Sequence, residues 1–526
     1  MADLTAWRAL VDKELAGAPF DKLVQRTAEG LAIEPLYVEA PAQATRPIGA
    51  ASFRVCMRAR PGEAAEHIDG GANALWLDGD DLAGHVFAAN RGVHVVSEHL
   101  DHAGEARDDE NVEEEVGEHT SWLSFDPIAH ALRMGAPHIV AHGGFLKMLV
   151  APALDLGDDA TRCARVSTLP HHAAGADAAD ELAIALSTTV AYLRALVEGG
   201  LDQDRAASQL WFQISVGRDT FGELCKLRAL RVLAAKLFAA SSIAAAIPPI
   251  HAVTSSRTQA ARDPWVNLLR VTTEVFAAAI GGADLVTPLA FDTELAEPSA
   301  LGRRIARNTA LVLRDESYLG RVIDAAGGSY YIESRTDALA REAWQRFRAI
   351  ERDGGIAKLI ASGALQARLD ASWATRAAAV AKRNEPVLGV SEFANLDEHV
   401  PSAPSGAAHG HRDAEAFEAL RAKYASRDVV LVSLGTPAES RARIGFAKAL
   451  FATAGVRARE AETGQIVCLC GSDDNYAAHA ASVAAQLRAA GATKIALAGK
   501  PNGTAGVDTY VYVGCDVIVA LEELLA

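Results

Sequence analysis

Short apolar, β-like runs alternate with Ala-, Leu- and Arg-rich helical stretches from about Ser52 to Leu388, and this alternation constrains the fold most. The runs are FRVCMRA, NALWL, VHVVSE, HIVAHGG, ARVSTLP, LWFQISVG, PPIHAVTSS, DLVTPLAF and SYYIES. A strand followed by a helix, repeated about eight times in some 340 residues, is typical of a (β/α)8 barrel. We therefore predict that residues 46–390 form a TIM barrel.

Three further parts flank the predicted barrel. Residues 1–45 begin with the amphipathic stretch LTAWRALVDKELAG and continue through the extended, Pro-marked GLAIEPLYVEA, which indicates an N-terminal arm. Residues 391–415 are rich in Pro, Ser, Gly and His without periodicity, which is typical of a linker. In residues 416–526 the apolar runs VVLVSL, QIVCLCG, KIALAG and TYVYVG alternate with helical segments, which predicts a small doubly wound α/β domain.

Composition and charge narrow the class of protein. A chain of 526 residues, half of them apolar, is too long for one ordinary core. Its formal net charge of −16 disfavours nucleic acid and anionic membranes as partners. Neither a signal-peptide pattern nor an apolar run long enough to cross a bilayer is present, so we expect a cytoplasmic protein. The six cysteines are scattered, and we expect reduced core thiols and no metal site.

Histidines and one acidic run are the candidates for chemistry. His171 and His172 follow a predicted strand and a proline, so they could lie at the catalytic mouth of the barrel. Adjacent residues of an extended chain point apart, which disfavours joint metal ligation. His142 and His251 lie in other predicted strands and could each act as an acid, a base or a ligand, although a lone histidine is more often structural. The acidic run from Glu105 to Thr120 indicates a solvated loop and not a cation site.

One strand–loop–helix unit lies where an open α/β sheet normally binds its ligand. The run VVLVSL feeds the loop GTPAES and then an Ala-rich helix, and ligands bind beyond the carboxyl ends of such strands. The loop contains no His or Cys, a single Gly, and neither a G-x-G-x-x-G nor a Walker pattern. Its residues by themselves therefore indicate no ligand.

Three long segments of the predicted barrel closely resemble blocks characteristic of the methylmalonyl-CoA mutase family. They are Arg304–Ile356, Trp211–Leu237 and Asn267–Asp292, and KLVQRTAEGLAIEPLY resembles the N-terminal arm of that family. The resemblance implies an acyl-CoA-binding barrel, a linker and a flavodoxin-like cobalamin domain. It also implies a radical rearrangement between methylmalonyl-CoA and succinyl-CoA, in which the weak Co–C bond of adenosylcobalamin supplies the radical and the protein positions and shields it.

The cobalamin signature of the family is missing from this chain. Catalytic members carry D-x-H-x-x-G, whose His ligates cobalt and whose Asp orients that His. Ala438, Ser440 and Arg443 stand at the Asp, His and Gly positions. A Ser hydroxyl is a poor cobalt ligand, and Arg in place of Gly would obstruct the approach of the corrin. We therefore expect no cobalamin on this chain.

The reaction site of the barrel departs from the family pattern as well. Catalytic members have a Tyr-His pair shortly before the segment E-A-G-A, and here Leu169 and Pro170 stand at those positions, one step before His171 and His172. The T-M-Y stretch that covers the substrate in catalytic members is also missing. The charges of KLRALR, Lys226–Arg231, could retain contacts with CoA or could simply form a helix surface.

These departures predict a catalytically silent paralogue. Within the family that is the small, or β, subunit of a heterodimeric enzyme, whose large catalytic subunit would bind the acyl-CoA and adenosylcobalamin. Two alternatives stay open. The chain could be an active acyl-CoA mutase that receives cobalamin from a separate protein and uses His171, His172 or His251, or it could be a scaffold for a cobalamin-loading or repair chaperone.

Overall fold

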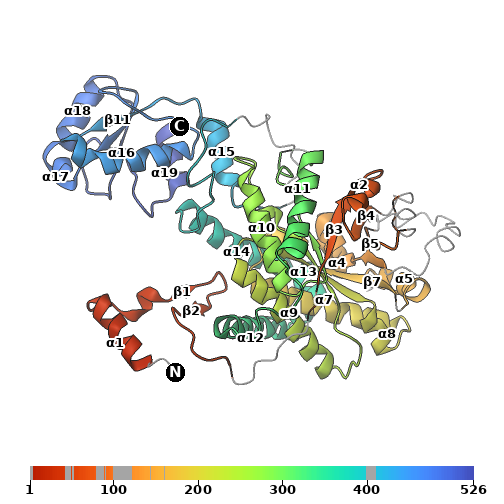
Figure 1. Cartoon of the computed structure of the whole chain (residues 1–526). Coiled ribbons are helices and arrows are strands. Elements are labelled where there is room, and N and C mark those ends of the chain that lie inside the picture. The colour runs from red at the N-terminus through yellow and green to blue at the C-terminus, as the bar shows by residue number, and fades with distance from the viewer. Residues whose placement is uncertain are drawn as a thin grey trace. The chain divides into compact units, whose positions relative to one another are not determined.

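The computed structural model describes residues 4–41, 49, 52–78, 84, 88, 91–98, 121–141, 144–158, 160–295, 297–398 and 410–526. The described residues do not include His142 or the acidic run from Glu105 to Thr120. The chain divides into two compact units, residues 1–254, 272–288 and 307–369, and residues 255–271, 289–306 and 370–526 (Figure 1).

Parallel strands close into an eight-stranded barrel in the first unit, which confirms the predicted (β/α)8 fold (Figure 1). In spatial order they are β10 (Leu285–Thr287), β3 (Arg54–Ala59), β4 (Ala74–Asp78), β5 (His94–Glu98), β6 (Ser121–Phe125), β7 (Thr161–Ser167), β8 (Leu210–Val216) and β9 (Ile250–Thr254). Strands β8, β9 and β10 are buried along their whole length, because in a barrel one face meets the interior and the other meets the helices.

Helices follow the barrel strands. They are α2 (Ala64–Asp69), α4 (Pro127–Arg133), α5 (Val150–Asp155), α6 (Leu169–Ala173), α7 (Ala178–Glu198), α8 (Gln203–Ser208), α9 (Thr220–Ala240), α10 (Val266–Ile280), α11 (Ala300–Leu311), α12 (Tyr330–Arg352), α13 (Gly355–Ala361) and α14 (Ala364–Ala381). The long helices α7, α9 and α12 pack against one another. Each begins at a side-chain cap, Asp177, Asp219 and Ser329 respectively, which satisfies a backbone N–H that has no partner inside the helix.

Two predicted strands are helical, and one strand was not predicted. HIVAHGG contributes to a 3-10 helix, η2 (Pro137–Ala141), which begins at a proline. SYYIES opens α12, because the hydroxyl of Ser329 accepts from the Ile332 amide at 3.5 Å and one helical face is buried. Cap and burial therefore override the β preference of Tyr-Tyr-Ile. The run SWLSF, which follows the acidic run directly, forms β6.

The N-terminal arm contains a helix and a small hairpin within the described residues. Helix α1 (Leu4–Leu15) is followed by a 3-10 turn, η1 (Phe20–Leu23), and by the antiparallel strands β1 (Gln25–Arg26) and β2 (Ala32–Ile33). No residue of α1 is buried. Its Trp7 contacts Phe20 edge-on, with ring centroids 6.3 Å apart. The helix thus lies exposed, with its tryptophan against the 3-10 turn of the arm.

A five-stranded parallel sheet lies in the second unit, as predicted (Figure 1). Its spatial order is β12 (Arg459–Glu460), β11 (Val429–Ser433), β13 (Ile466–Cys470), β14 (Lys494–Leu497) and β15 (Thr509–Tyr510), and the associated helices are α15 (Glu415–Tyr424), α16 (Pro437–Ala452), α17 (Asp473–Asn475), α18 (Ala481–Ala489) and α19 (Val517–Leu525). In order of sequence this is 2-1-3-4-5, the flavodoxin-like arrangement. The order reverses between β11 and β13, so that pair marks the place where such sheets bind ligands.

The six cysteines are buried and free, which confirms the expected core thiols. Burial raises the pKa of the Cys56 thiol to about 12, so that thiol stays protonated and unreactive at neutral pH. Among the helices in the described part of the chain, none is both long and apolar enough to span a membrane.

Candidate functional sites at the strand ends

The positions of the missing Tyr-His pair lie on a short helix at the carboxyl end of β7. Leu169 and Pro170 begin α6, and His171 and His172 are its third and fourth residues. The expectation of an extended chain was wrong here. The His172 amide donates a hydrogen bond to the backbone carbonyl oxygen of Thr168 at 2.8 Å, which forms a helical turn. Both imidazoles are buried.

His172 belongs to an internal charged cluster. Its Nδ1 lies 2.8 Å from Glu181 Oε1, and the same oxygen accepts from Lys226 Nζ at 3.1 Å. Lys226 also pairs with Glu223 at 2.6 Å, and Thr168 donates to Glu181 at 2.9 Å. Burial alone would lower the pKa of Lys226, but the two carboxylates raise it, so the ammonium remains charged. This cluster ties α6, α7 and α9 together.

His171 is buried without a charge. Burial lowers the pKa of its imidazole to about 4, although the Glu181 carboxylate opposes the shift. Its Nδ1 has no hydrogen-bond partner among the described residues. A group with this pKa is neutral at pH 7, and at 1% exposure it has little access to a substrate. The arrangement gives no support to acid–base catalysis by His171.

His251 lies inside the barrel in a layer of aromatic rings. Its Nε2 is 2.7 Å from Thr287 Oγ1, and its Nδ1 is 3.4 Å from the Gln213 side chain. Its ring lies 5.5 Å from that of Trp76 and 6.3 Å from that of Trp211, centroid to centroid. His251 is therefore a satisfied core histidine.

The same layer continues around the barrel. Trp122 lies 5.4 Å from Trp211, and His94 lies 4.7 Å from Trp122. Burial lowers the pKa of His94 to about 3, so this ring is also neutral. An eight-stranded barrel has an interior just wide enough for side chains to fill, and three tryptophans fill this part of it. Sequence reasoning did not single them out, although NALWL, SWLSF and LWFQ each carry a tryptophan inside a β-like run.

The charges of KLRALR are buried, so the interpretation as a helix surface was wrong. Lys226 pairs with the carboxylates named above, Arg228 pairs with Asp324 and with Glu333 at 3.0 Å, and Arg231 pairs with Asp284 at 2.7 Å. Each cation already has a carboxylate partner within the chain. They stabilise the packing of α9 against the neighbouring elements.

Asp126, at the carboxyl end of β6, is a buried carboxylate that the sequence did not point to. It accepts from the Ser167 amide at 2.8 Å, the Tyr192 hydroxyl at 2.5 Å and the Ala129 amide at 3.0 Å. Burial raises its pKa, and Arg165 opposes that shift. These contacts cap α4 and join it to β7 and α7. Because β6 was not predicted, no signal placed this residue at a strand end.

The loop GTPAES in the second unit begins α16 with a capping box. The Thr436 side chain accepts from the backbone amide of Glu439, and the Glu439 side chain accepts from the backbone amide of Thr436. Pro437 lies in the first turn of the helix. Ser440 is buried, and its Oγ lies 3.2 Å from both Ser433 Oγ and the Thr436 carbonyl oxygen. The hydroxyl is therefore engaged with the backbone and side chains of its own strand–helix junction.

Arg443 reaches across the carboxyl ends of the strands. Its Nη1 donates to the Ala498 carbonyl oxygen at 2.7 Å, and its Nη2 pairs with Asp473 at 3.1 Å. Tyr476 donates to the same Ala498 carbonyl oxygen at 2.9 Å and accepts from the Gly471 amide at 2.8 Å. Two bulky side chains thus bond the backbone at the ends of β13 and β14.

Other features of the described residues indicate no additional chemistry. No group of three or more His, Cys, Asp or Glu side chains is placed to hold a metal ion in that part of the chain. A hollow of about 620 Å³ lies along α12, beside residues such as Gln345 and Arg348, and no strand-end residue lines it.

Comparisons with a family model and with individual relatives agree on one protein family. A model described as methylmalonyl-CoA mutase matches residues 160–458. The chain is 43% identical over 394 residues to a methylmalonyl-CoA mutase small subunit of Streptomyces virginiae, an alignment that covers 69% of this chain and 64% of that protein. It is 36% identical over 439 residues to a probable methylmalonyl-CoA mutase small subunit of Mycobacterium tuberculosis (strain ATCC 25618 / H37Rv), covering 77% and 70%.

A large subunit is also a relative. The methylmalonyl-CoA mutase large subunit of Streptomyces virginiae is 38% identical over 231 residues, which cover 43% of this chain and 32% of that protein. The chain thus spans less than two thirds of the Streptomyces small subunit, whereas the family model covers more than half of the chain. By that match and by its identity to these relatives, the chain belongs to the methylmalonyl-CoA mutase family.

Proposed function

We propose that this chain is the non-catalytic small subunit of an adenosylcobalamin-dependent methylmalonyl-CoA mutase and that it stabilises a large subunit which interconverts methylmalonyl-CoA and succinyl-CoA. The observation that carries the proposal is the guanidinium of Arg443, which bonds the Ala498 carbonyl oxygen where a ligand of the sheet would enter. The names of the relatives indicate that enzymes of this family can consist of a small and a large subunit.

The residues of the second unit do not fit cobalamin. Ser440, at the family's cobalt-ligand position, is buried, and its hydroxyl is turned to Ser433 and Thr436. Ala438 has no group that could orient a ligand. Arg443 and Tyr476 occupy the backbone acceptors at the strand ends. We therefore place the cofactor on the large subunit and derive no reaction step on this chain.

The barrel supports the same proposal. Leu169 and Pro170, at the positions of the reacting pair, have no acid, base or hydrogen-bonding side chain. His171 is neutral and buried, and His172 is held by Glu181. His251 lies in an aromatic layer that fills the interior. The acyl-CoA is therefore assigned to the large subunit.

An exposed apolar surface on the first unit favours a protein partner. Five large side chains at the start of α9, in the loop before α12 and at the start of α12 are each at least half exposed: Phe221, Tyr318, Val322, Ile323 and Tyr330. Two polar contacts attach the loop to the helices, because Asp324 pairs with buried Arg228 and the Gly328 amide donates to Glu333 at 2.8 Å. Such patches mark interaction surfaces, and a preorganised loop loses little entropy on binding.

The proposal is tested by cobalamin binding to the purified chain. We expect no corrin absorption to co-purify and no micromolar affinity for adenosylcobalamin or hydroxocobalamin by titration. Ser440→His alone should not create binding, because Ala438 and Arg443 are unchanged; the triple variant Ala438→Asp, Ser440→His, Arg443→Gly removes all three obstacles. Tight binding by the unaltered chain, or mutase turnover by it without a large subunit, would overturn the proposal in favour of an active mutase.

A further inference from the structure

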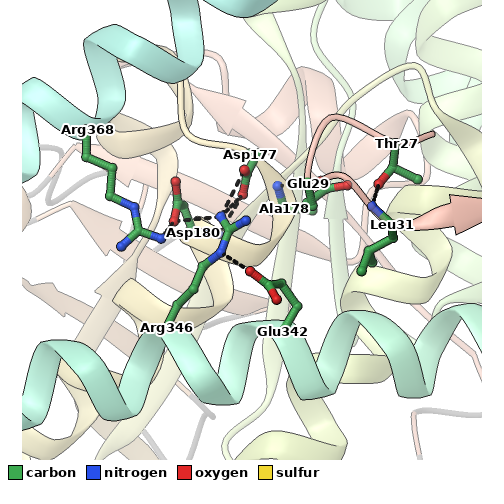
Figure 2. A network of polar contacts seen from close by, with 9 residues as sticks. All are labelled: Thr27, Glu29, Leu31, Asp177, Ala178, Asp180, Glu342, Arg346 and Arg368. Atoms are coloured by element: carbon green, nitrogen blue, oxygen red, sulfur yellow. Dashed lines mark hydrogen bonds and ion pairs between the residues drawn. The ribbon is translucent and has the colours of Figure 1, made fainter.

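The hairpin of the N-terminal arm presents one carboxylate at its tip. Strands β1 and β2 are joined by a turn in which the Thr27 amide donates to the Leu31 carbonyl oxygen at 2.9 Å, and the Leu31 amide donates to Thr27 Oγ1 at 3.1 Å. Gly30 has a φ of +82°, which a residue without a Cβ adopts readily. The turn is therefore well defined, and Glu29 lies at its tip (Figure 2).

Glu29 contacts the barrel at the start of α7. Its Oε1 accepts from the Ala178 amide at 3.0 Å, across 149 residues of sequence. Ala178 is the first residue of α7, whose N-cap Asp177 accepts from a different amide, that of Asp180, at 2.8 Å. A carboxylate at this position is favoured by the helix dipole and satisfies an amide that no residue of the helix can bond.

Two arginines offset part of the negative charge around this contact (Figure 2). Arg346 of α12 donates to Asp177 and Asp180 at 2.8 Å each and to Glu342 at 2.7 Å. Arg368 of α14 pairs with Asp180 as well. Without these guanidinium groups the two aspartates would repel the approaching carboxylate of Glu29. The start of α7 thus offers one amide donor to Glu29 beside a partly neutralised acidic cluster.

The arm makes a second contact with the barrel through an aromatic pair. The ring of Tyr37 lies 5.2 Å from that of Tyr331 at the start of α12. Helix α1, by contrast, has no buried residue, and Leu10 is 63% exposed. The arm therefore consists of a part attached to the barrel, residues 25–37, and an amphipathic helix without buried residues.

We propose that Glu29 anchors residues 25–37 of the arm to the barrel of the same chain, and that this anchor prepares the arm for binding to the large subunit. The second half of this inference rests on the proposed function, whereas the anchor itself concerns the chain alone. An arm fixed before the encounter loses less conformational entropy on binding, so the anchor raises affinity without contacting the partner. Glu29 is thus a positioning residue for assembly.

The anchor is tested first on the isolated chain. We expect Glu29→Ala to increase trypsin cleavage after Arg26 and hydrogen exchange of the Leu31 amide about fivefold, the equivalent of one hydrogen bond of about 1 kcal/mol. Glu29→Gln retains an acceptor oxygen and should stay within about twofold of the parent. Glu34→Ala, an exposed change in the same arm, is the matched control and should have no effect. Equal protection in Glu29→Ala and the parent would overturn the anchor.

The second test adds the large subunit. Glu29→Ala should weaken the measured Kd about fivefold, mainly through slower association, while Glu29→Gln and Glu34→Ala match the parent. An unchanged Kd in a variant that has lost protection would overturn the role in assembly. If the parent chain itself does not bind the large subunit, the proposed function fails, while the protection experiment still decides on the anchor.

Discussion

At the barrel mouth, buried polar side chains form hydrogen bonds and ion pairs with other residues of the same chain. The Glu181 carboxylate, for example, receives Thr168, His172 and Lys226. Removing one member of this cluster would leave the others buried and unsatisfied. At this scale, the contacts of Glu181, His172 and Lys226 favour a role in stability.

His171→Asn should leave the turnover of the assembled enzyme within about threefold, whereas loss of an acid–base group costs on the order of a hundredfold. Its effect should appear in acid stability. Because burial lowers the pKa of His171 to about 4, the unfolded chain binds the proton first as the pH falls below about 6.5. The parent should therefore lose about 2 kcal/mol from this group between pH 7 and pH 5, and the variant should not.

Urea unfolding of both proteins at pH 7 and pH 5 measures that difference. Identical losses in parent and variant would show that His171 does not titrate in this window. A drop of a hundredfold in turnover without dissociation of the complex would instead restore His171 as a catalytic candidate.

The strand–loop–helix element β11–α16 contains a tight turn at its single glycine. Gly435 has a φ of +86°, and a Cβ at this position would lie 2.1 Å from Asn475 Nδ2. The tight turn lets Thr436 cap α16. The loop therefore needs its one glycine for the turn itself, which explains a glycine in a loop without any phosphate-binding pattern.

Gly435→Ala should destabilise the second unit by roughly 1–3 kcal/mol, since positive φ and a clash act together. Gly445→Ala is the matched control. Gly445 lies inside α16, and a Cβ added there would have no other atom within 4 Å. That change should stabilise by about 0.5–1 kcal/mol. Thermal unfolding of the two variants should therefore shift in opposite directions; a shift of both in the same direction would contradict this account of the loop.

At the scale of the whole molecule, the proposed function assigns a role in assembly to segments that this chain shares with its family. These are the arm, the loop before α12 and a complete parallel sheet. Phe221 and Tyr37 both contact Tyr331, with centroid distances of 5.7 and 5.2 Å, so Tyr331 links the arm to one of the exposed apolar side chains.

Deletion of residues 1–40 should abolish association with the large subunit, because obligate interfaces bury roughly 2,000 Å² or more and a large part of the apolar surface would be removed. Co-purification of the tagged, truncated chain with the large subunit provides the measurement, with the full-length chain as the control. Recovery of a stoichiometric complex without the arm would place the interface elsewhere.

The sequence by itself determined the two sheet architectures and the family. Alternation of apolar runs with helical stretches is a local property, so the barrel and the doubly wound sheet could be predicted without any long-range contact. The prediction that this chain binds no cobalamin also depends on the sequence alone, because the residues at the family positions carry different functional groups. SYYIES was predicted wrongly, since its β preference is local whereas the burial that makes it helical is not.

Only the tertiary structure decided which charged and aromatic residues are interior. From the sequence, Arg228 and Arg231 could be interpreted as surface charges, because their partners Glu333 and Asp284 lie 105 and 53 residues away along the chain. The same holds for Glu29, whose partner Ala178 is 149 residues away, and for the tryptophans that fill the barrel from separate strands. Burial and pairing depend on which segments the closed barrel brings together, and no local pattern records that.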